Sequence, residues 1–196
     1  MIRDTIQEDY ILCGTPSISN KEVLYPDWGG NIHCRFITSG KKKWTFSSGK
    51  QSKWFSSPSI SDSIVYFVSS DSILFAVSLK LGSEKWRYKA KGNISRAPSF
   101  TDSILVFTTS NSHLYALSKN NGKLLWEYVS TGTTWSYPVI VSNIVYYGCG
   151  DGKLYAFDIH TGELIWSFSS DNSVNTPVLS DEAIFFTSGQ YLYKIE

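Results

Sequence analysis

The chain has 196 residues, 42% of them hydrophobic and 15% aromatic, which is enough to bury a sizeable core and excludes an intrinsically disordered protein. Its 18 basic and 17 acidic residues give a net charge of +1, so the sequence lacks the positive charge expected of a nucleic-acid-binding protein. No stretch approaches the roughly 18 consecutive apolar residues that cross a bilayer, and no membrane insertion is predicted.

The first 15 residues precede the regular part of the sequence. They carry acidic side chains where a secretory signal has a basic segment followed by an apolar run. The three cysteines, Cys13, Cys34 and Cys149, are an odd number scattered along the chain, which argues against a disulfide framework and fits a reducing compartment. We therefore expect a cytoplasmic location, or a periplasmic or extracellular one if a signal has been removed.

A β-strand repeat with a period near 40 residues follows. In the copy at residues 138–166, the runs IVYY, LYAF and ELIWSF are rich in β-branched and aromatic residues, and GDG and HTG between them are turn signals. In four copies a tryptophan lies 28 residues after a proline, and a glycine lies 24 residues after the same proline. The copies begin at Pro16, Pro58, Pro98, Pro138 and, incompletely, Pro177; the tryptophans are Trp44, Trp86, Trp126 and Trp166, and the glycines are Gly40, Gly82, Gly122 and Gly162.

A fixed period near 40 built from strands alone predicts an all-β fold, a β-propeller of about five four-stranded blades in a single domain spanning residues 1–196. The middle strands are apolar on both faces, as expected of strands packed between neighbouring blades. The outer strands alternate apolar and polar residues, and we interpret their repeated tryptophan as a wedge between blades rather than a platform for a cofactor.

The fifth copy ends at LYKIE, before its outer strand. Residues 1–15 stand at the distance from Pro16 where an outer strand of the preceding blade is expected. We therefore predict that they complete the last blade and close the ring, with residues 3–7 beside residues 192–195.

The first repeat is the most divergent. Pro26 cannot donate to a ladder, so the hairpin after it is expected to be shorter or looser than the others. His33 and Cys34 stand where the other copies have LF, LY and LY. The three histidines, His33, His113 and His160, fall at different repeat positions, and we interpret them as surface or edge residues; no metal site is predicted.

The segments LYAFDIHTGELIW, LYALSKNNGKLLW and LFAVSLKLGSEKW resemble the repeat of pyrroloquinoline-quinone-type propellers. That superfamily includes quinoprotein dehydrogenases and the propeller lipoprotein of the bacterial outer-membrane assembly machinery. The resemblance implies the propeller fold. A quinoprotein active site would need bound calcium, a catalytic Asp and often an adjacent Cys pair, and no such Cys pair occurs here, so we expect no enzyme activity and no cofactor.

The loops that follow the outer strands vary between repeats, and binding surfaces are commonly built from such loops. Together with the middle hairpins they are expected to collect aromatic residues and an arginine at one end of the propeller, a composition typical of interaction hot spots. These residues are Tyr10, Trp28, Trp54, Phe55, Arg96, Trp135 and Tyr137.

For Phe55 and Trp135, filling of a central channel is an equal alternative. The predicted function is a non-catalytic module that binds another protein. The alternatives are a lectin-like propeller that binds a carbohydrate or small ligand and, third, a fragment of a quinone-dependent oxidoreductase.

Overall fold

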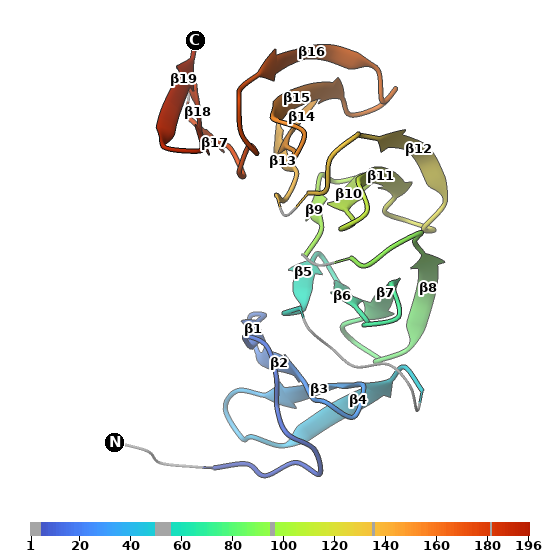
Figure 1. Cartoon of the computed structure of the whole chain (residues 1–196). Helices are drawn as coiled ribbons and strands as arrows, with labels where there is room; N and C mark the ends of the chain where they lie inside the picture. Colours follow the sequence, from blue (N-terminus) through green and yellow to red (C-terminus); the bar gives the residue numbers. More distant parts are fainter. Residues whose placement is uncertain (1–4, 50–55, 95–96, 135, 181) are drawn as a thin grey trace. The chain divides into compact units, whose positions relative to one another are not determined.

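The computed structural model describes residues 5–49, 56–94, 97–134, 136–180 and 182–196 (Figure 1). Within these residues the chain forms short β-strands joined by turns, and no helix occurs, so the all-β prediction is confirmed. The chain divides into two compact units, Met1–Lys89 and Ala90–Glu196. Each unit consists of small antiparallel sheets, and each is described by itself.

The first unit contains two four-stranded sheets, called sheets 1 and 2, in which neighbouring strands are also consecutive in the sequence. This order follows from short turns, which join antiparallel neighbours. Sheet 1 consists of β1 (Ser17–Ile18), β2 (Glu22–Pro26), β3 (Asn31–Phe36) and β4 (Lys42–Ser47), and sheet 2 of β5 (Ser59–Ser61), β6 (Ile64–Val68), β7 (Ile73–Ser78) and β8 (Glu84–Lys89).

The second unit contains three sheets with the same order of strands, called sheets 3, 4 and 5. Sheet 3 consists of β9 (Ser99–Phe100), β10 (Ile104–Thr108), β11 (His113–Ser118) and β12 (Leu124–Val129), and sheet 4 of β13 (Val139–Val141), β14 (Ile144–Gly148), β15 (Lys153–Asp158) and β16 (Leu164–Ser169). Sheet 5 has three strands, β17 (Val178–Leu179), β18 (Ile184–Ser188) and β19 (Tyr191–Ile195).

Burial follows the pattern expected from the sequence. All five residues of the middle strand β10 are buried, as are five of the six in β7. In the outer strand β8, by contrast, Trp86 is buried while its neighbours Lys85 and Arg87 are exposed. Middle strands therefore carry the core, and outer strands present one face to solvent.

The ladder between the third and fourth strands shifts at the same place in sheets 1 to 4, directly after the residue that pairs with the repeated tryptophan. That partner is small in every case, which leaves room for the indole on the same face of the sheet. The pairs are Cys34 with Trp44, Ala76 with Trp86, Ala116 with Trp126, and Ala156 with Trp166.

Two of these tryptophans join their own sheet to the next one. The indole Nε1 of Trp44 in sheet 1 donates a hydrogen bond of 2.9 Å to the carbonyl oxygen of Leu79, which directly follows β7 in sheet 2. Trp126 in sheet 3 donates in the same way to Ile159, which follows β15 in sheet 4, at 2.8 Å. The bond fixes the indole over the turn between the third and fourth strands of the neighbouring sheet.

A glycine in that turn makes the close approach possible. A Cβ at Gly82 would lie 2.7 Å from carbons of the Trp44 ring, and one at Gly162 would lie 2.6 Å from the Trp126 ring. Both glycines have left-handed backbone, with φ of +69° and +73°. Only glycine meets both demands without strain.

The N-terminal segment contacts sheet 1 of the first unit. The Glu8 carboxylate binds Arg35, and the backbone of Cys13 donates to Pro26. Sheet 5 has three strands among the described residues. Residues 3 and 4 of the predicted pairing with residues 192–195 lie outside the described residues, and the two segments belong to different units, so the pairing stays a prediction.

The β2–β3 hairpin corrects an expectation from the sequence. It contains five residue pairs, from Glu22 with Phe36 to Pro26 with Ile32, the same number as β6–β7. The prediction of a shorter hairpin is wrong because Pro26 occupies the last position of β2. Its carbonyl accepts a hydrogen bond of 3.1 Å from the amide of Cys13.

Candidate functional site

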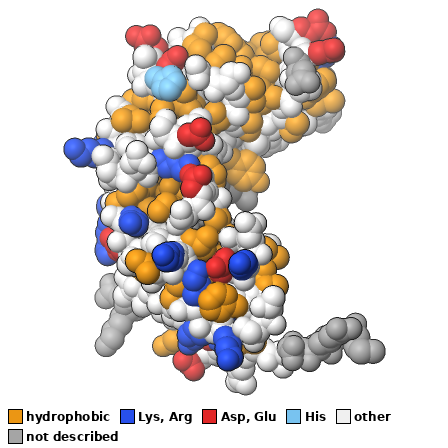
Figure 2. Space-filling model, turned by 180° about the vertical axis from the view of Figure 1, so that it is seen from behind, with side chains coloured by type: hydrophobic (Ala, Val, Ile, Leu, Met, Phe, Trp, Pro, Cys, Tyr) orange, Lys and Arg blue, Asp and Glu red, His pale blue; other side chains and the backbone are white. Residues whose placement is uncertain are grey.

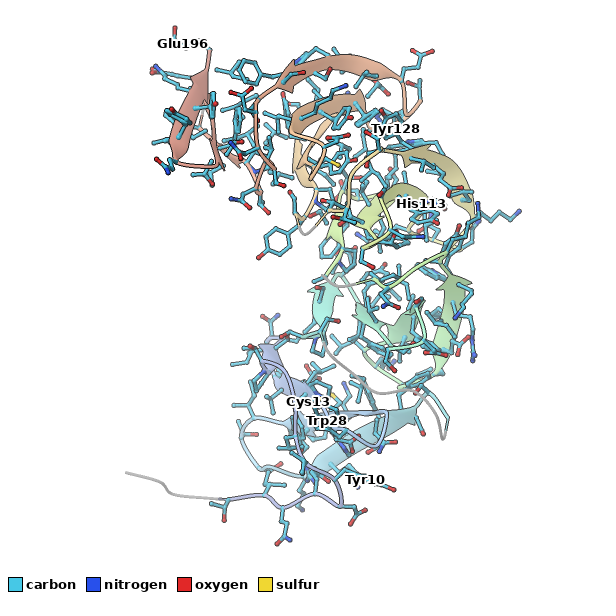
Figure 3. The ribbon with its side chains drawn as sticks, viewed as in Figure 1. Tyr10, Cys13, Trp28, His113, Tyr128 and Glu196 are labelled. Carbon is cyan, nitrogen blue, oxygen red and sulfur yellow. The ribbon has the colours of Figure 1, made fainter. Side chains whose placement is uncertain are left out.

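Among the described residues, the best-defined candidate site lies where the N-terminal segment crosses the β2–β3 turn. Leu12 forms a bridge with Asp27, and the amide of Trp28 donates to the carbonyl of Ile11 at 2.9 Å. The ring of Tyr10 covers Gly29 so closely that a Cβ there would lie 2.4 Å from it. Gly29 therefore allows the aromatic ring to approach the turn closely, in the region marked by Tyr10, Cys13 and Trp28 in Figure 3.

Four large apolar side chains are exposed on this crossing and are called the Tyr10–Trp28 surface. Their exposed fractions are 55% for Tyr10, 78% for Ile11, 48% for Leu12 and 43% for Trp28. Exposed aromatic and aliphatic side chains held together by backbone hydrogen bonds are typical of interaction sites.

A buried polar cluster connects the segment that carries this surface to sheet 1. The carboxylate of Glu8 accepts hydrogen bonds from the Tyr25 hydroxyl at 2.6 Å and from Arg35 Nη2 at 2.7 Å. The ring of His33 stacks on Tyr25, and its Nε2 lies 2.9 Å from Asp27 Oδ2, while Nδ1 lies 3.8 Å from Glu8. The cluster therefore ties the N-terminal segment to β2, β3 and the turn between them.

These contacts alter the acidity of three groups. Burial opposes ionisation of Glu8, but hydrogen bonds from Tyr25 and Arg35 outweigh it and hold the pKa of Glu8 below its ordinary value. Burial also opposes ionisation of Asp27, and hydrogen bonds from Asn31 and His33 lower its pKa in the same way. Burial and the bond to Glu8 raise the pKa of Tyr25 to about 12. Both carboxylates are therefore charged at neutral pH and paired with donors.

The sequence interpretation of His33 as a surface or edge residue is wrong. Its exposed fraction is 5%, and it stands where sheets 2 to 4 have Phe75, Tyr115 and Tyr155. The replacement of an aromatic by histidine in a buried repeat position was the signal for the polar cluster. Glu8 carried no such signal, because it precedes the first repeat.

Of the seven residues predicted to form a binding face, the structure brings Tyr10 and Trp28 together in the first unit. Tyr137 belongs to the second unit, where its exposed fraction is 43%. The other four, Trp54, Phe55, Arg96 and Trp135, lie outside the described residues, and their role stays a prediction.

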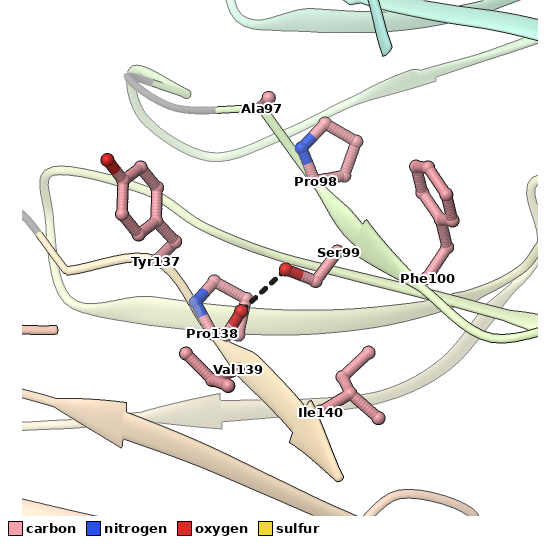
Figure 4. Close-up of a pocket in the computed structure, with 8 residues that line it drawn as sticks. All are labelled: Ala97, Pro98, Ser99, Phe100, Tyr137, Pro138, Val139 and Ile140. Carbon is pink, nitrogen blue, oxygen red and sulfur yellow. Dashed lines mark hydrogen bonds between the residues drawn. The ribbon is translucent and has the colours of Figure 1, made fainter. Parts of the chain in front are cut away.

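Tyr137 borders an open groove of about 500 Å³ in the second unit. Figure 4 shows that the groove lies between β9 with the preceding Pro98 and β13 with the preceding Tyr137. The hydroxyl of Ser99 donates to the carbonyl of Pro138 across it at 2.5 Å. The groove is thus mainly apolar, with an aromatic ring at its rim.

The described residues were also searched for metal sites and membrane-spanning helices. Among the described residues, no group of three or more His, Cys, Asp and Glu side chains is placed to hold a metal ion. A search of the same residues for a helix that could cross a membrane also found none. On the face seen in Figure 2, side chains of both charges are interspersed with hydrophobic ones, as the net charge of +1 leads one to expect.

The repeated strands, the tryptophan contacts and the glycine turns can now be compared with known proteins. A family model described as "Outer membrane protein assembly factor BamB" matches residues 10–196. The chain belongs to this family of PQQ-like propeller repeats. No curated protein sequence matches the chain.

Solved structures of this repeat type share the fold at low sequence identity. BamB from Moraxella catarrhalis is 15% identical, with a TM-score of 0.71 over 93% of this chain and 57% of that one. The quinohemoprotein alcohol dehydrogenase from Comamonas testosteroni is 14% identical, with a TM-score of 0.73 over 90% of this chain and 40% of that one. The chain therefore spans about half the length of the structures that it resembles, and the likeness concerns the fold.

Proposed function

We propose that the chain is a non-catalytic module that binds another protein and that the Tyr10–Trp28 surface is part of its contact face. The observation that carries this proposal is the exposure of two aromatic and two aliphatic side chains on one backbone crossing, which the ion pair of Glu8 with Arg35 ties to sheet 1. An apolar surface that is already ordered before binding loses little conformational entropy on association. The family model is named for an assembly factor, which supports binding of another protein.

The ionisable groups of sheet 1 support a structural rather than a catalytic role for the cluster. Glu8, Arg35 and Tyr25 bind one another, and Asp27 binds His33. Their hydrogen bonds hold the N-terminal segment in place. We also propose that the five sheets are successive blades and that the chain works in a reducing compartment such as the cytoplasm, since Cys13, Cys34 and Cys149 are free thiols.

The test is a comparison of partner capture by the wild-type chain and by the variant Trp28→Ala. Captured proteins are identified by mass spectrometry, and their affinity is then measured with purified components. We expect Trp28→Ala to weaken binding by about 2 kcal/mol, as for a hot-spot aromatic, without lowering the melting temperature. Leu81→Ala is the matched control, because Leu81 is an exposed apolar residue (67%) of a turn in sheet 2. Equal affinities for both variants would remove the Tyr10–Trp28 surface from the contact face.

Binding of a small ligand or carbohydrate is the second candidate. The exposed ring of Tyr137 beside the groove of about 500 Å³ favours it, because an aromatic face can stack on an apolar sugar face. A saturable rise in melting temperature with one glycan of an array, lost in Tyr137→Ala, would support this candidate. A uniform absence of such shifts would contradict it.

A further inference from the structure

The outer strand of sheet 4 forms an open edge. β16 pairs with β15, and no other described strand pairs with it (Figure 1). Sheets 3 and 5 of the same unit cover the two faces of sheet 4, because Tyr128 packs on Tyr155 from one side and Phe186 packs on Phe168 from the other. Blades of a propeller pack face to face, so an additional blade would not pair with this edge.

The edge lacks the charges that commonly prevent strands of different chains from pairing. Edge strands of natural proteins carry charged residues, lysine above all, for this purpose. The outer strands of sheets 1 to 3 follow this rule, since β4 reads KKWTFS, β8 reads EKWRYK and β12 reads LLWEYV. β16 reads LIWSFS and has no charged residue. The nearest charges, Glu163 and Asp171, lie beyond its two ends and are exposed to solvent, where salt screens them.

Backbone groups of β16 point out of the sheet. The amide of Ser170 donates to the carbonyl of Gly152, directly before β15, at 2.8 Å. Bonded positions alternate along an antiparallel ladder, so the amides and carbonyls of Ser167 and Ser169 face away from β15. Both serines are exposed. The shift in the ladder leaves Ile165 without an opposite residue, and this bulge ends the regular edge at residues 166–169.

We propose that two copies of the chain pair through this edge, antiparallel and related by a two-fold axis beside Ser167. This register places Ser167 opposite Ser167 of the second copy and Trp166 opposite Phe168 of the second copy. The outward backbone groups of each copy then bond those of the other, and the aromatic pairs add cross-strand contacts. Because both copies use the same edge, the assembly closes as a dimer.

The same register is unfavourable in the other outer strands. In each of them the residue directly after the tryptophan would meet itself across the axis. That residue is Arg87 in β8 and Glu127 in β12, so like charges would stand directly opposite each other. In β4 it is Thr45, but two lysines begin that strand. Ser167 meets its own copy without repulsion. The charge pattern therefore favours β16 as the paired strand and a second copy of this chain as its occupant.

This inference goes beyond the proposed function and concerns a different surface. Sedimentation of the wild-type chain over a series of concentrations is expected to show a reversible monomer–dimer equilibrium. Ser167→Lys should raise the dissociation constant of the dimer by about tenfold or more, because two lysines then face each other. Val129→Lys adds the same charge at an exposed position of β12 and should dimerise as the wild type does. A wild-type chain that stays monomeric, or equal dissociation constants for wild type and Ser167→Lys, would overturn the proposal.

Charge complementation tests the register. Ser167→Asp should also dimerise weakly, because two aspartates then stand opposite each other. A mixture of Ser167→Lys and Ser167→Asp should form a dimer with one copy of each, detected by native mass spectrometry, since opposite charges now meet. Both variants should melt near the wild-type temperature, because Ser167 is exposed. If the folded variants do not form the mixed dimer, the pairing about Ser167 is wrong.

A measurement on the wild-type chain alone does not depend on how the variants fold. Amide exchange followed by NMR at low and high protein concentration should slow at Ser167 and Ser169 as the dimer forms. The amide of Arg87, at the same position in sheet 2, should not change. Equal exchange rates of the two serines at both concentrations would overturn the proposal. Trp28→Ala should dimerise normally; loss of the dimer in that variant would assign the contact to the Tyr10–Trp28 surface instead of β16.

Discussion

The indole of Trp44 donates a hydrogen bond of 2.9 Å to the carbonyl of Leu79, 35 residues later in the chain. We expect Trp44→Ala to lower the free energy of unfolding by about 3–5 kcal/mol, because it removes a buried aromatic side chain between two sheets. Trp44→Phe should cost less, since it keeps an aromatic ring and loses the bond, worth about 1 kcal/mol, and part of the ring. Denaturation in urea measures both.

Trp28→Ala is the control for this prediction, because Trp28 is 43% exposed and its replacement should change stability little. The equivalent change at Trp126, which is only partly buried, should cost less than that at Trp44. Equal stability of wild type and Trp44→Ala would contradict the role of the indole as a link between sheets.

The glycine turns allow a matched comparison. Gly82→Ala places a Cβ 2.7 Å from the Trp44 ring, whereas Gly40→Ala, at nearly the same φ, meets only the flexible end of Ile6 at 3.4 Å. Both variants carry the strain of a left-handed alanine, about 1 kcal/mol, and only Gly82→Ala adds the clash with the indole. We expect Gly82→Ala to be more destabilising by about 1–3 kcal/mol, measured by urea denaturation. A larger loss of stability from Gly40→Ala than from Gly82→Ala would contradict this prediction.

Glu8 should make stability depend on pH. Its pKa is lower in the folded chain than in the unfolded chain, so its contribution is present above the ordinary pKa and is lost as pH falls through the lowered value. Glu8→Gln should therefore lower the melting temperature at pH 7, and the difference from wild type should disappear in acid. Thermal melts from pH 7 to pH 2 test this, with the exposed neighbour Asp9→Asn as control. A difference that persists unchanged in acid would show that Glu8 acts through packing alone.

The pair of His33 and Asp27 should show strong coupling. His33→Phe restores the aromatic residue found at the equivalent position in sheet 2, but it leaves the buried Asp27 carboxylate without its imidazole partner. In a double-mutant cycle with Asp27→Asn, we expect a coupling free energy of about 1–3 kcal/mol, since both groups belong to one buried network. Additive effects of the two changes would contradict this.

The strand pattern could be predicted from the sequence because it depends on periodicity. A repeat of proline, glycine and tryptophan at fixed spacing marks the turns of each copy, and its tryptophan makes an inter-sheet hydrogen bond in sheets 1 and 3. The indole and the glycine need each other sterically, as Trp44 and Gly82 show, so their spacing carries structural information. The family resemblance followed from the same residues.

The polar cluster could not be predicted in this way. Glu8 lies outside the repeat, and its contact with Arg35 spans 27 residues that no periodic pattern connects. Counting residues predicts where a strand is missing, but it does not show which buried charge the segment containing Glu8 meets. His33 was visible as a departure from the repeat, yet only the carboxylates around it explain the exchange of an aromatic ring for an imidazole.

The direction of the tryptophan contacts bears on how the chain is made. Each acceptor carbonyl follows its indole by 33 to 35 residues, so a ribosome synthesises the tryptophan before the turn that receives it. At roughly 5–20 residues per second, the indole waits about 2 to 7 seconds with its apolar face uncovered. Residues 5–13, which contact Tyr25, Arg35 and Pro26 of sheet 1, are synthesised before that sheet. In sheets 1 and 3 the nascent chain therefore exposes an apolar indole until the turn that accepts its hydrogen bond has been made.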